Sequence, residues 1–267
     1  MSAAALIFAI QILSVIGSAL TAAKLYRTGL YRRYRFFFWY FLFRIPNSTW
    51  PLFFHNFVYT KADWYFIIWV ITEPITWIFH TAVVLELYRL VLEKYKGLYT
   101  LGRWAMVTGI GISVTISLVS LIPKMTRAVS EQSRWMFRYL AMERGLMLGL
   151  AIFLIFMIGF LILYTVPISR NLKIHARNYT IFFISNYLAF LLQSFFGMKV
   201  QGGLWFTWTN VLADAIAASC VFAWFFLLNP KGEEVQTSHP IISAQHERLI
   251  LHQLDALNAT LLKASRK

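Results

Sequence analysis

Residues 204–228 read LWFTWTNVLADAIAASCVFAWFFLL, an apolar run in which Asp214 is the one charged residue. An α-helix rises about 1.5 Å per residue, so about 20 such residues cross the roughly 30 Å hydrocarbon core of a bilayer. Similar runs recur along the chain with short charged connections between them. They cover residues 3–23, 36–57, 64–90, 104–122, 136–166 and 179–198. The sequence therefore predicts an all-α polytopic membrane protein, a bundle of seven transmembrane helices.

The composition also indicates that lipid is the solvent of this chain. Hydrophobic residues make up 59% of it and charged residues 13%, whereas soluble domains have about 25% charged residues. The mean hydropathy is +0.60. The formal net charge is +14, but the Lys and Arg residues lie mostly in short connections, where the positive-inside rule accounts for them. We therefore expect the lipid bilayer as a partner, and no nucleic acid.

The basic residues predict an orientation, because cytoplasmic connections carry an excess of Lys and Arg. The residues of the first, third and fifth connections that favour it are Lys24, Arg27, Arg32, Arg33, Arg35, Arg89, Lys94, Lys96, Arg103, Arg170, Lys173 and Arg177. Four residues oppose it: Lys124, Arg127, Arg134 and Arg138. Because the basic residues that favour this orientation outnumber those that oppose it, the sequence predicts an external N-terminus and a cytoplasmic C-terminus. No cleavable signal peptide is evident, and we expect a bacterial inner (plasma) membrane.

The chain becomes polar after Leu228, which predicts two parts: a transmembrane domain over residues 1–228 and a cytoplasmic tail over residues 229–267. Apolar residues in the tail are spaced by four, three and four, as in a short amphipathic helix. They are Ile250, Leu254, Leu257 and Leu261. Two interpretations stay open. The helix lies on the membrane surface, or residues 239–265 bind a cytoplasmic protein or a second copy in a homo-oligomer.

The second apolar run contains the segment RIPNSTWP at residues 44–51. Each of its two prolines removes a backbone hydrogen-bond donor from the helix. We therefore predict a kinked or broken helix, with freed carbonyls that face protein or water.

Ionisable residues inside the apolar runs need partners or water, because each costs about 2.5–3.5 kcal/mol in a bilayer. Counted from the ends of their runs, Arg44, Glu73 and Asp214 lie at similar depth. We predict that Arg44 meets Glu73, Asp214 or both. Such a cluster is either an ion pair that fixes helix packing or a ligand or proton site. His80 lies two turns from Glu73 on the same face of the run. Two interpretations stay open: His80 relays a proton, or it is a packing residue held by a hydrogen bond.

Polar side chains form two stripes at helical spacing. Tyr179, Asn186 and Gln193 are seven residues apart in the sixth run. In the seventh run, Thr207, Asn210 and Asp214 form the second stripe. The two stripes either line a hydrated cavity or hydrogen-bond one another across the bundle.

Other residues in the runs have local explanations. Glu86 with Arg89 indicates an ion pair at the membrane edge, and Arg144, beside Glu143, is placed to extend toward the interface. Gly145 and Gly149 form a GxxxG pattern, which favours close helix contact. Gly109, Ser113 and Ser117 repeat this spacing in the fourth run, and Ser14, Ser18 and Ala22 repeat it in the first.

One set of residues resembles the microbial rhodopsins, which have seven helices and an external N-terminus. Trp69, Thr72 and Pro74 match the Trp-x-x-Thr-x-Pro pattern of their third helix, and Asp214 matches the aspartate four residues before their retinal-binding lysine. Ala218 stands at that lysine position, so a retinal Schiff base cannot form there.

No catalytic or metal-binding motif is present, and Cys220, the single cysteine, excludes a disulfide within the chain. We therefore predict no catalytic residue, no metal and no cofactor, and an enzyme is not favoured. The function that we expect is a sensor-like or accessory membrane subunit that couples a ligand or partner in the bundle to cytoplasmic proteins. The alternative is an ion- or proton-coupled transporter of small molecules that uses the charges at mid-depth.

Overall fold

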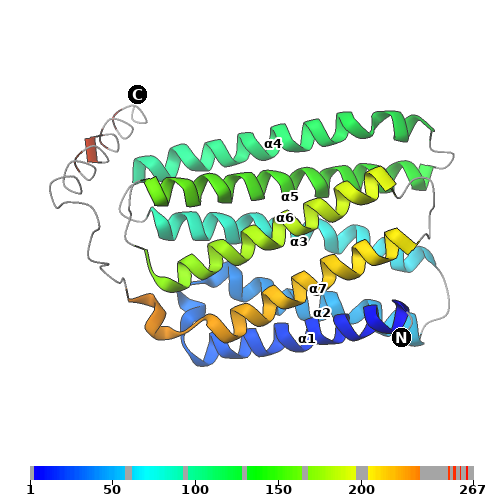
Figure 1. Ribbon diagram of the computed structural model, residues 1–267, viewed down its shortest axis with the longest axis horizontal. Helices are drawn as coiled ribbons and strands as arrows, with labels where there is room; N and C mark the ends of the chain where they lie inside the picture. The colour runs from blue at the N-terminus through cyan, green and yellow to red at the C-terminus, as the bar shows by residue number, and fades with distance from the viewer. Residues whose placement is uncertain are drawn as a thin grey trace.

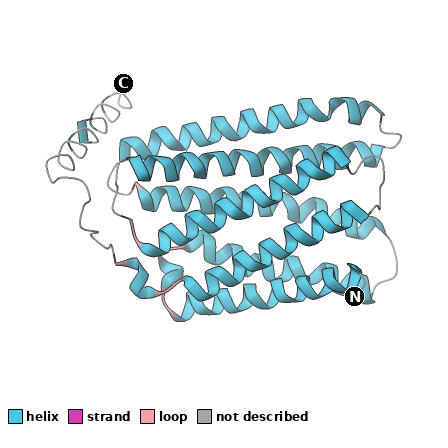
Figure 2. Cartoon of the chain, in the orientation of Figure 1, coloured by secondary structure: helices cyan, strands magenta, loops and turns pink. Residues whose placement is uncertain are grey.

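A computed structural model describes residues 3–57, 62–92, 96–127, 131–163, 168–196 and 204–234, together with positions 252, 255, 256, 259 and 263. Its α-helices are α1 (Ala3–Arg27), α2 (Arg35–Phe57), α3 (Ala62–Val91), α4 (Lys96–Arg127), α5 (Glu131–Leu163), α6 (Arg170–Phe196) and α7 (Leu204–Leu227). Two short 3-10 helices, η1 (Leu30–Arg32) and η2 (Pro230–Glu233), follow α1 and α7. All regular secondary structure in these residues is helical (Figure 2), and each predicted run overlaps one helix, although α4 and α6 begin well before their runs.

Five of the helices are long and apolar enough to cross a membrane. These spans are Ala5–Arg27, Ile67–Val91, Gly102–Ser120, Arg138–Leu161 and Thr207–Leu227. Within the described residues, α2 and α6 fall short of this level, because α2 contains Arg44 with two prolines and α6 begins with a basic segment. Large apolar side chains also cover the outside of the bundle, including Phe156, Phe226 and Ile78. These features are those of an integral membrane protein.

The helices lie side by side, and successive helices run in opposite directions (Figure 1). Helix α1 packs between α2 and α7, α6 packs between α5 and α7, and α3 contacts α2, α5 and α6. Helix α4 packs against α5 and touches α3, and it lies at the side of the bundle opposite α1. The end at which α1 finishes and η2 follows α7 is called here the tail end.

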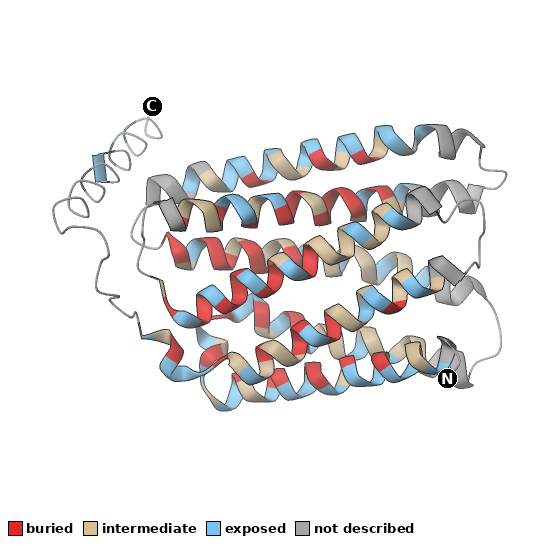
Figure 3. Ribbon diagram, viewed as in Figure 1, coloured by how far each residue is buried: buried red, intermediate tan, exposed pale blue. Residues whose placement is uncertain are grey.

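The largest fully buried side chains gather near the tail end and come from the connection between α1 and α2 and from α2, α6 and α7. They include Tyr34, Phe37, Phe41, Tyr179, Phe183 and Trp224. Helix α4 contributes few buried positions (Figure 3); among its described residues these are Met106, Ser113 and Ser117. The core is therefore aromatic on the side of α2, α6 and α7, and α4 lies at its edge.

Small residues let α5 approach α4 closely, as the GxxxG pattern predicts. A Cβ atom on Gly145 would lie 2.5 Å from the Cα atom of Val114, and one on Gly149 would lie 3.0 Å from the Cα atom of Ile110. Both neighbours are backbone atoms, which cannot rotate away. The close contact predicted for this pattern is confirmed.

Of the predicted kink or break in the second helix, the break is wrong, because α2 continues through Pro46 and Pro51, and the kink stays a prediction. Side chains around these prolines hydrogen-bond within the helix. The Trp50 indole donates to Asn47 Oδ1 at 3.2 Å, and the Thr49 hydroxyl donates to the Ile45 carbonyl at 2.7 Å. Prolines are tolerated inside membrane helices where the surroundings satisfy the backbone groups that the prolines free.

The apolar residues of the predicted tail helix lie outside the described residues. The five tail positions that the structure describes are helical and exposed. The boundary between two domains at Leu228 stays a prediction.

Candidate functional site

Three helices meet at Arg44. Its Nη1 donates to the Tyr40 hydroxyl at 2.6 Å, and its Nη2 donates to the Ser14 hydroxyl of α1 at 3.0 Å. Nε2 of His80, on α3, lies 3.3 Å from the same Tyr40 oxygen. Arg44 Nε and His80 Nδ1 are buried and have no hydrogen-bond partner. Arg44 and His80 are therefore brought together through Tyr40, which sequence reasoning did not select.

The predicted ion pair of Arg44 with Glu73 or Asp214 is not formed. Asp214 is exposed and interacts with Arg44 electrostatically without an ion pair. Side chains of a helix point toward its N-terminus. Arg44 therefore extends toward the tail end, whereas Glu73 and Asp214, on antiparallel helices, extend the other way. Equal depth of the Cα atoms was not enough to predict a contact.

Glu73 faces α5 and interacts electrostatically with Glu143. In the same contact, the Tyr139 hydroxyl donates to the Val70 carbonyl at 2.9 Å. This arrangement was not predicted.

Two local interpretations are also corrected. Arg144 does not extend to the interface: it is buried, and its guanidinium donates to the Ser117 carbonyl and the Ser120 hydroxyl of α4. Glu143 and Arg144 face different helices because adjacent helical residues differ by about 100° in direction.

Glu86 has a partner other than the predicted one. Its two carboxylate oxygens accept hydrogen bonds from the backbone N–H groups of Phe36 and Phe37, at 3.1 and 3.2 Å. These N–H groups begin α2 and have no acceptor within the helix, so the buried carboxylate caps it. Arg89 is exposed and acts on Glu86 only electrostatically.

The structure describes only part of the two predicted polar stripes, so their contact stays a prediction. The Asn186 amide donates to the Phe182 carbonyl of its own helix at 2.7 Å. Asn210 is half-buried on α7. The side chain of Gln193 lies outside the described residues.

A buried histidine that the sequence analysis passed over lies at the tail end. His175 is fully buried, with ring centroids 4.4 Å from Phe37 and 4.5 Å from Tyr34. Neither ring nitrogen has a hydrogen-bond partner, nor do Tyr179 Oη and Trp224 Nε1 nearby. Burial lowers the pKa of His175, which precedes the predicted span 179–198, to about 3, so the ring is neutral.

One turn before His175, the Asn171 side chain holds the segment that follows α7. Its Nδ2 donates to the Asn229 carbonyl at 2.7 Å, and its Oδ1 accepts from the Asn229 N–H at 3.2 Å. Asn171 Nδ2 also donates to Glu233. A Cβ atom on Gly232 would lie 2.4 Å from Asn171 Oδ1, so this close approach requires glycine.

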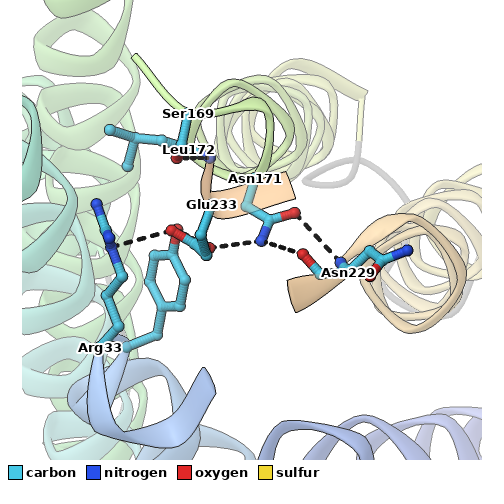
Figure 4. Close-up of polar contacts among 7 residues, drawn as sticks. Arg33, Ser169, Asn171, Leu172, Asn229 and Glu233 are labelled. Atoms are coloured by element: carbon cyan, nitrogen blue, oxygen red, sulfur yellow. Dashed lines mark hydrogen bonds and ion pairs between the residues drawn. The ribbon is translucent and has the colours of Figure 1, made fainter. Parts of the chain in front are cut away.

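Glu233 joins three segments of the chain (Figure 4). Besides Asn171, it accepts a hydrogen bond from the Tyr34 hydroxyl at 2.8 Å and forms an ion pair with Arg33 at 3.0 Å. Burial and the Glu233 carboxylate raise the pKa of Tyr34, so its hydroxyl stays protonated and donates. Arg33, Tyr34, Asn171, Asn229 and Glu233 are called here the latch.

The sequence did contain a signal for part of this cluster. Asn171, His175 and Asn178 recur at spacings of four and three, which places them on one face of α6. Nothing in the spacing indicated that Asn229 and Glu233 would bind Asn171.

No protein-family model, no curated protein and no solved structure matches this chain. The resemblance to microbial rhodopsins therefore rests on Trp69, Thr72, Pro74 and Asp214 alone. Within the described part of the chain, no group of three or more His, Cys, Asp or Glu residues is placed to hold a metal ion.

Proposed function

We propose that this chain crosses a bacterial inner membrane seven times, with the N-terminus outside and the tail in the cytoplasm. The exposed residues Arg27, Arg33, Arg89, Arg103 and Arg170 all lie toward the tail end, which is the distribution expected on the cytoplasmic side. A fluorescent-protein fusion after Lys267 and a periplasmic phosphatase fusion in residues 128–130 should both be active. The reverse pattern would overturn the orientation.

We propose further that the protein is a sensor-like or accessory membrane subunit, in which the state of the bundle is passed to the tail. The observation that carries this proposal is the position of Glu233. It lies near the start of the tail and is bound by Tyr34 and Arg33 from the connection between α1 and α2, and by Asn171 from α6. A shift of α6 relative to α2 changes the geometry of all three contacts at once.

The latch is continuous with the buried polar groups of the bundle. Tyr34 contacts His175, and Phe37 contacts both His175 and Phe41. Tyr40 packs on Phe41 at a centroid distance of 5.4 Å and carries the hydrogen bond from Arg44. Spatial continuity alone does not establish coupling. The proposal requires two states of the latch, closed and open, whose populations depend on the bundle.

The experiment measures the distance between the tail and the bundle by pulsed electron paramagnetic resonance. Spin labels are attached at Arg32→Cys and His252→Cys, both exposed positions, with Cys220 replaced by alanine. Glu233→Gln should lengthen and broaden the distance distribution. Glu234→Gln is the matched control, since the adjacent Glu234 is exposed and makes none of the latch contacts. Identical distributions for the two variants would remove the latch from the mechanism.

A second pair of variants tests whether the bundle acts on the tail. Tyr40→Phe removes the hydroxyl that Arg44 and His80 share, and it should shift the same distance distribution. Tyr187→Phe, at a partly buried position on α6, is the control. If Tyr40→Phe leaves the tail unchanged while Glu233→Gln releases it, the latch is a static anchor and the sensor proposal fails.

The alternative is proton-coupled transport, favoured by the facing carboxyl groups of Glu73 and Glu143. In liposomes that enclose a pH-sensitive dye, this reading predicts proton flux in the wild type and its loss in Glu73→Gln and Asp214→Asn. Flux in both variants at the wild-type rate, or none in the wild type, would contradict it.

A further inference from the structure

An apolar cavity of about 440 Å³ lies between α3, α4 and α5, in the half of the bundle near the tail end. Its lining includes Leu92, Met106, Phe153, Met157 and Phe160, and its polar groups are few, chiefly the Ser113 hydroxyl. The volume falls in the range of small-molecule sites, about 300–1,000 Å³. An apolar lining of this kind favours hydrocarbon over ordered water.

Glycines on α4 and α5 shape this cavity. Near the middle of the bundle, Gly145 holds α5 against the backbone of α4. Closer to the tail end, no atom lies within 4 Å of the Cβ position of Gly109, which lines the cavity. A larger side chain at Gly109 would therefore occupy the cavity without a clash against the backbone.

The cavity opens sideways, toward the outside of the bundle. Two of its lining residues on α5 are exposed, Ile152 by 40% and Phe156 by 73%. Helices α4 and α5 are both among the spans that are apolar enough to cross a membrane. A hydrocarbon chain can thus enter from the bilayer without passing through water.

Two residues that line the end of the cavity are each followed in the chain by an arginine. Tyr88 and Gly102 line it on α3 and α4, and a Cβ atom on Gly102 would lie 1.7 Å from the Tyr88 hydroxyl oxygen. Arg89 and Arg103 directly follow these residues in the chain and are both exposed. Guanidinium groups at this level of a bundle match the phosphate of an anionic lipid.

We propose that this cavity binds an anionic phospholipid of the membrane. One acyl chain occupies the space beside Gly109, and the phosphate lies between Arg89 and Arg103. This assignment is independent of the coupling between the bundle and the tail.

The test is native mass spectrometry of the full-length protein, titrated with phosphatidylglycerol or with phosphatidylcholine of the same acyl chains. The wild type should retain one phosphatidylglycerol in preference to phosphatidylcholine. Gly109→Leu should weaken this binding by at least about tenfold, because several methylene groups lose their burial. Gly111→Leu is the matched control, since Gly111 lies on the same helix, is exposed, and also has no atom within 4 Å of its Cβ position.

The charge on the two arginines is tested separately. Arg89→Gln with Arg103→Gln should reduce phosphatidylglycerol binding to the level of phosphatidylcholine. Equal binding of the two lipids by the wild type would overturn the assignment, as would equal effects of Gly109→Leu and Gly111→Leu.

A photoreactive phosphatidylglycerol provides a measurement that needs no variant. Its acyl chain should crosslink to α4 and α5 around Gly109 and Phe156, and crosslinks confined to other helices would also overturn it.

Discussion

The latch and the contact between α4 and α5 hold the bundle together by opposite means. In the latch, polar groups far apart in the sequence are joined, with Asn171 and Asn229 separated by 58 residues and Tyr34 and Glu233 by 199. In the α4–α5 contact, Gly145 and Gly149 supply no side chain at all, and the backbones meet. The first contact depends on directed hydrogen bonds and the second on shape. They should therefore respond differently to substitution and to pH.

The largest effect is expected at the α4–α5 contact. Gly145→Leu places a side chain where the Val114 backbone lies 2.5 Å from the Cβ position. Overpacking costs about 1–3 kcal/mol where neighbours relax, and more where they are backbone. We therefore expect a loss of about 3 kcal/mol or more in the free energy of unfolding, measured by titration with SDS. Gly159→Leu, with no atom within 4 Å, should change it by less than about 0.5 kcal/mol. Equal losses in the two variants would show that the contact is not set by shape.

In the latch, Asn171→Ala should cost about 1–3 kcal/mol locally, because the Asn229 N–H and carbonyl groups both lose their partner. The effect should fall on the chain after α7. We expect faster protease cleavage after residue 234, with little change in SDS-induced unfolding of the helices. If Asn171→Ala lowers the free energy of SDS-induced unfolding by the full amount expected for the latch, the latch is part of the global core.

A third effect, comparable in size to that of Asn171→Ala, is expected from pH at His175, beside the latch. The native pKa of His175 is about 3, below the unfolded value of 6.5, so the unfolded state binds more protons. Its contribution to stability is complete above about pH 6.5 and is lost as pH falls. Between pH 6.5 and 5 the loss is about 2 kcal/mol.

His175→Phe should remove this part of the acid sensitivity, measured as the difference in unfolding free energy at the two pH values. His252→Phe, at an exposed tail position, should leave it unchanged. An identical pH dependence of wild type and His175→Phe would show that the buried ring becomes protonated without cost.

Sequence reasoning located the helices and one of these two regions. The apolar runs overlap α1–α7 because a helix is built from hydrogen bonds four residues apart and lipid selects apolar side chains along it. The Gly145–Gly149 contact was also predictable, since small residues at a spacing of four form one face of a helix. The proline segment of α2 misled because a proline removes hydrogen bonds without fixing whether the helix ends.

The partners of the polar groups were not predictable in the same way. Arg44 was assigned to Glu73 or Asp214 by depth, but its guanidinium is bound by Tyr40 and Ser14. Glu86 was assigned to Arg89 by spacing and instead caps α2. In each case a partner comes from another helix, Ser14 of α1 for Arg44 and the first turn of α2 for Glu86, although Tyr40 lies on the same helix as Arg44. The identity of such a partner depends on which helices are neighbours and on which way their side chains point.

The sequence by itself determined the order and the approximate positions of the helices, because these follow from local hydrogen bonding and from the composition of each run. The tertiary structure alone decided that Glu233 binds Tyr34 and Asn171, that Glu73 faces Glu143, and that a cavity lies beside Gly109. The physical reason is that a polar group in a water-poor interior takes the nearest partner in space. That partner is set by helix packing and not by distance along the chain.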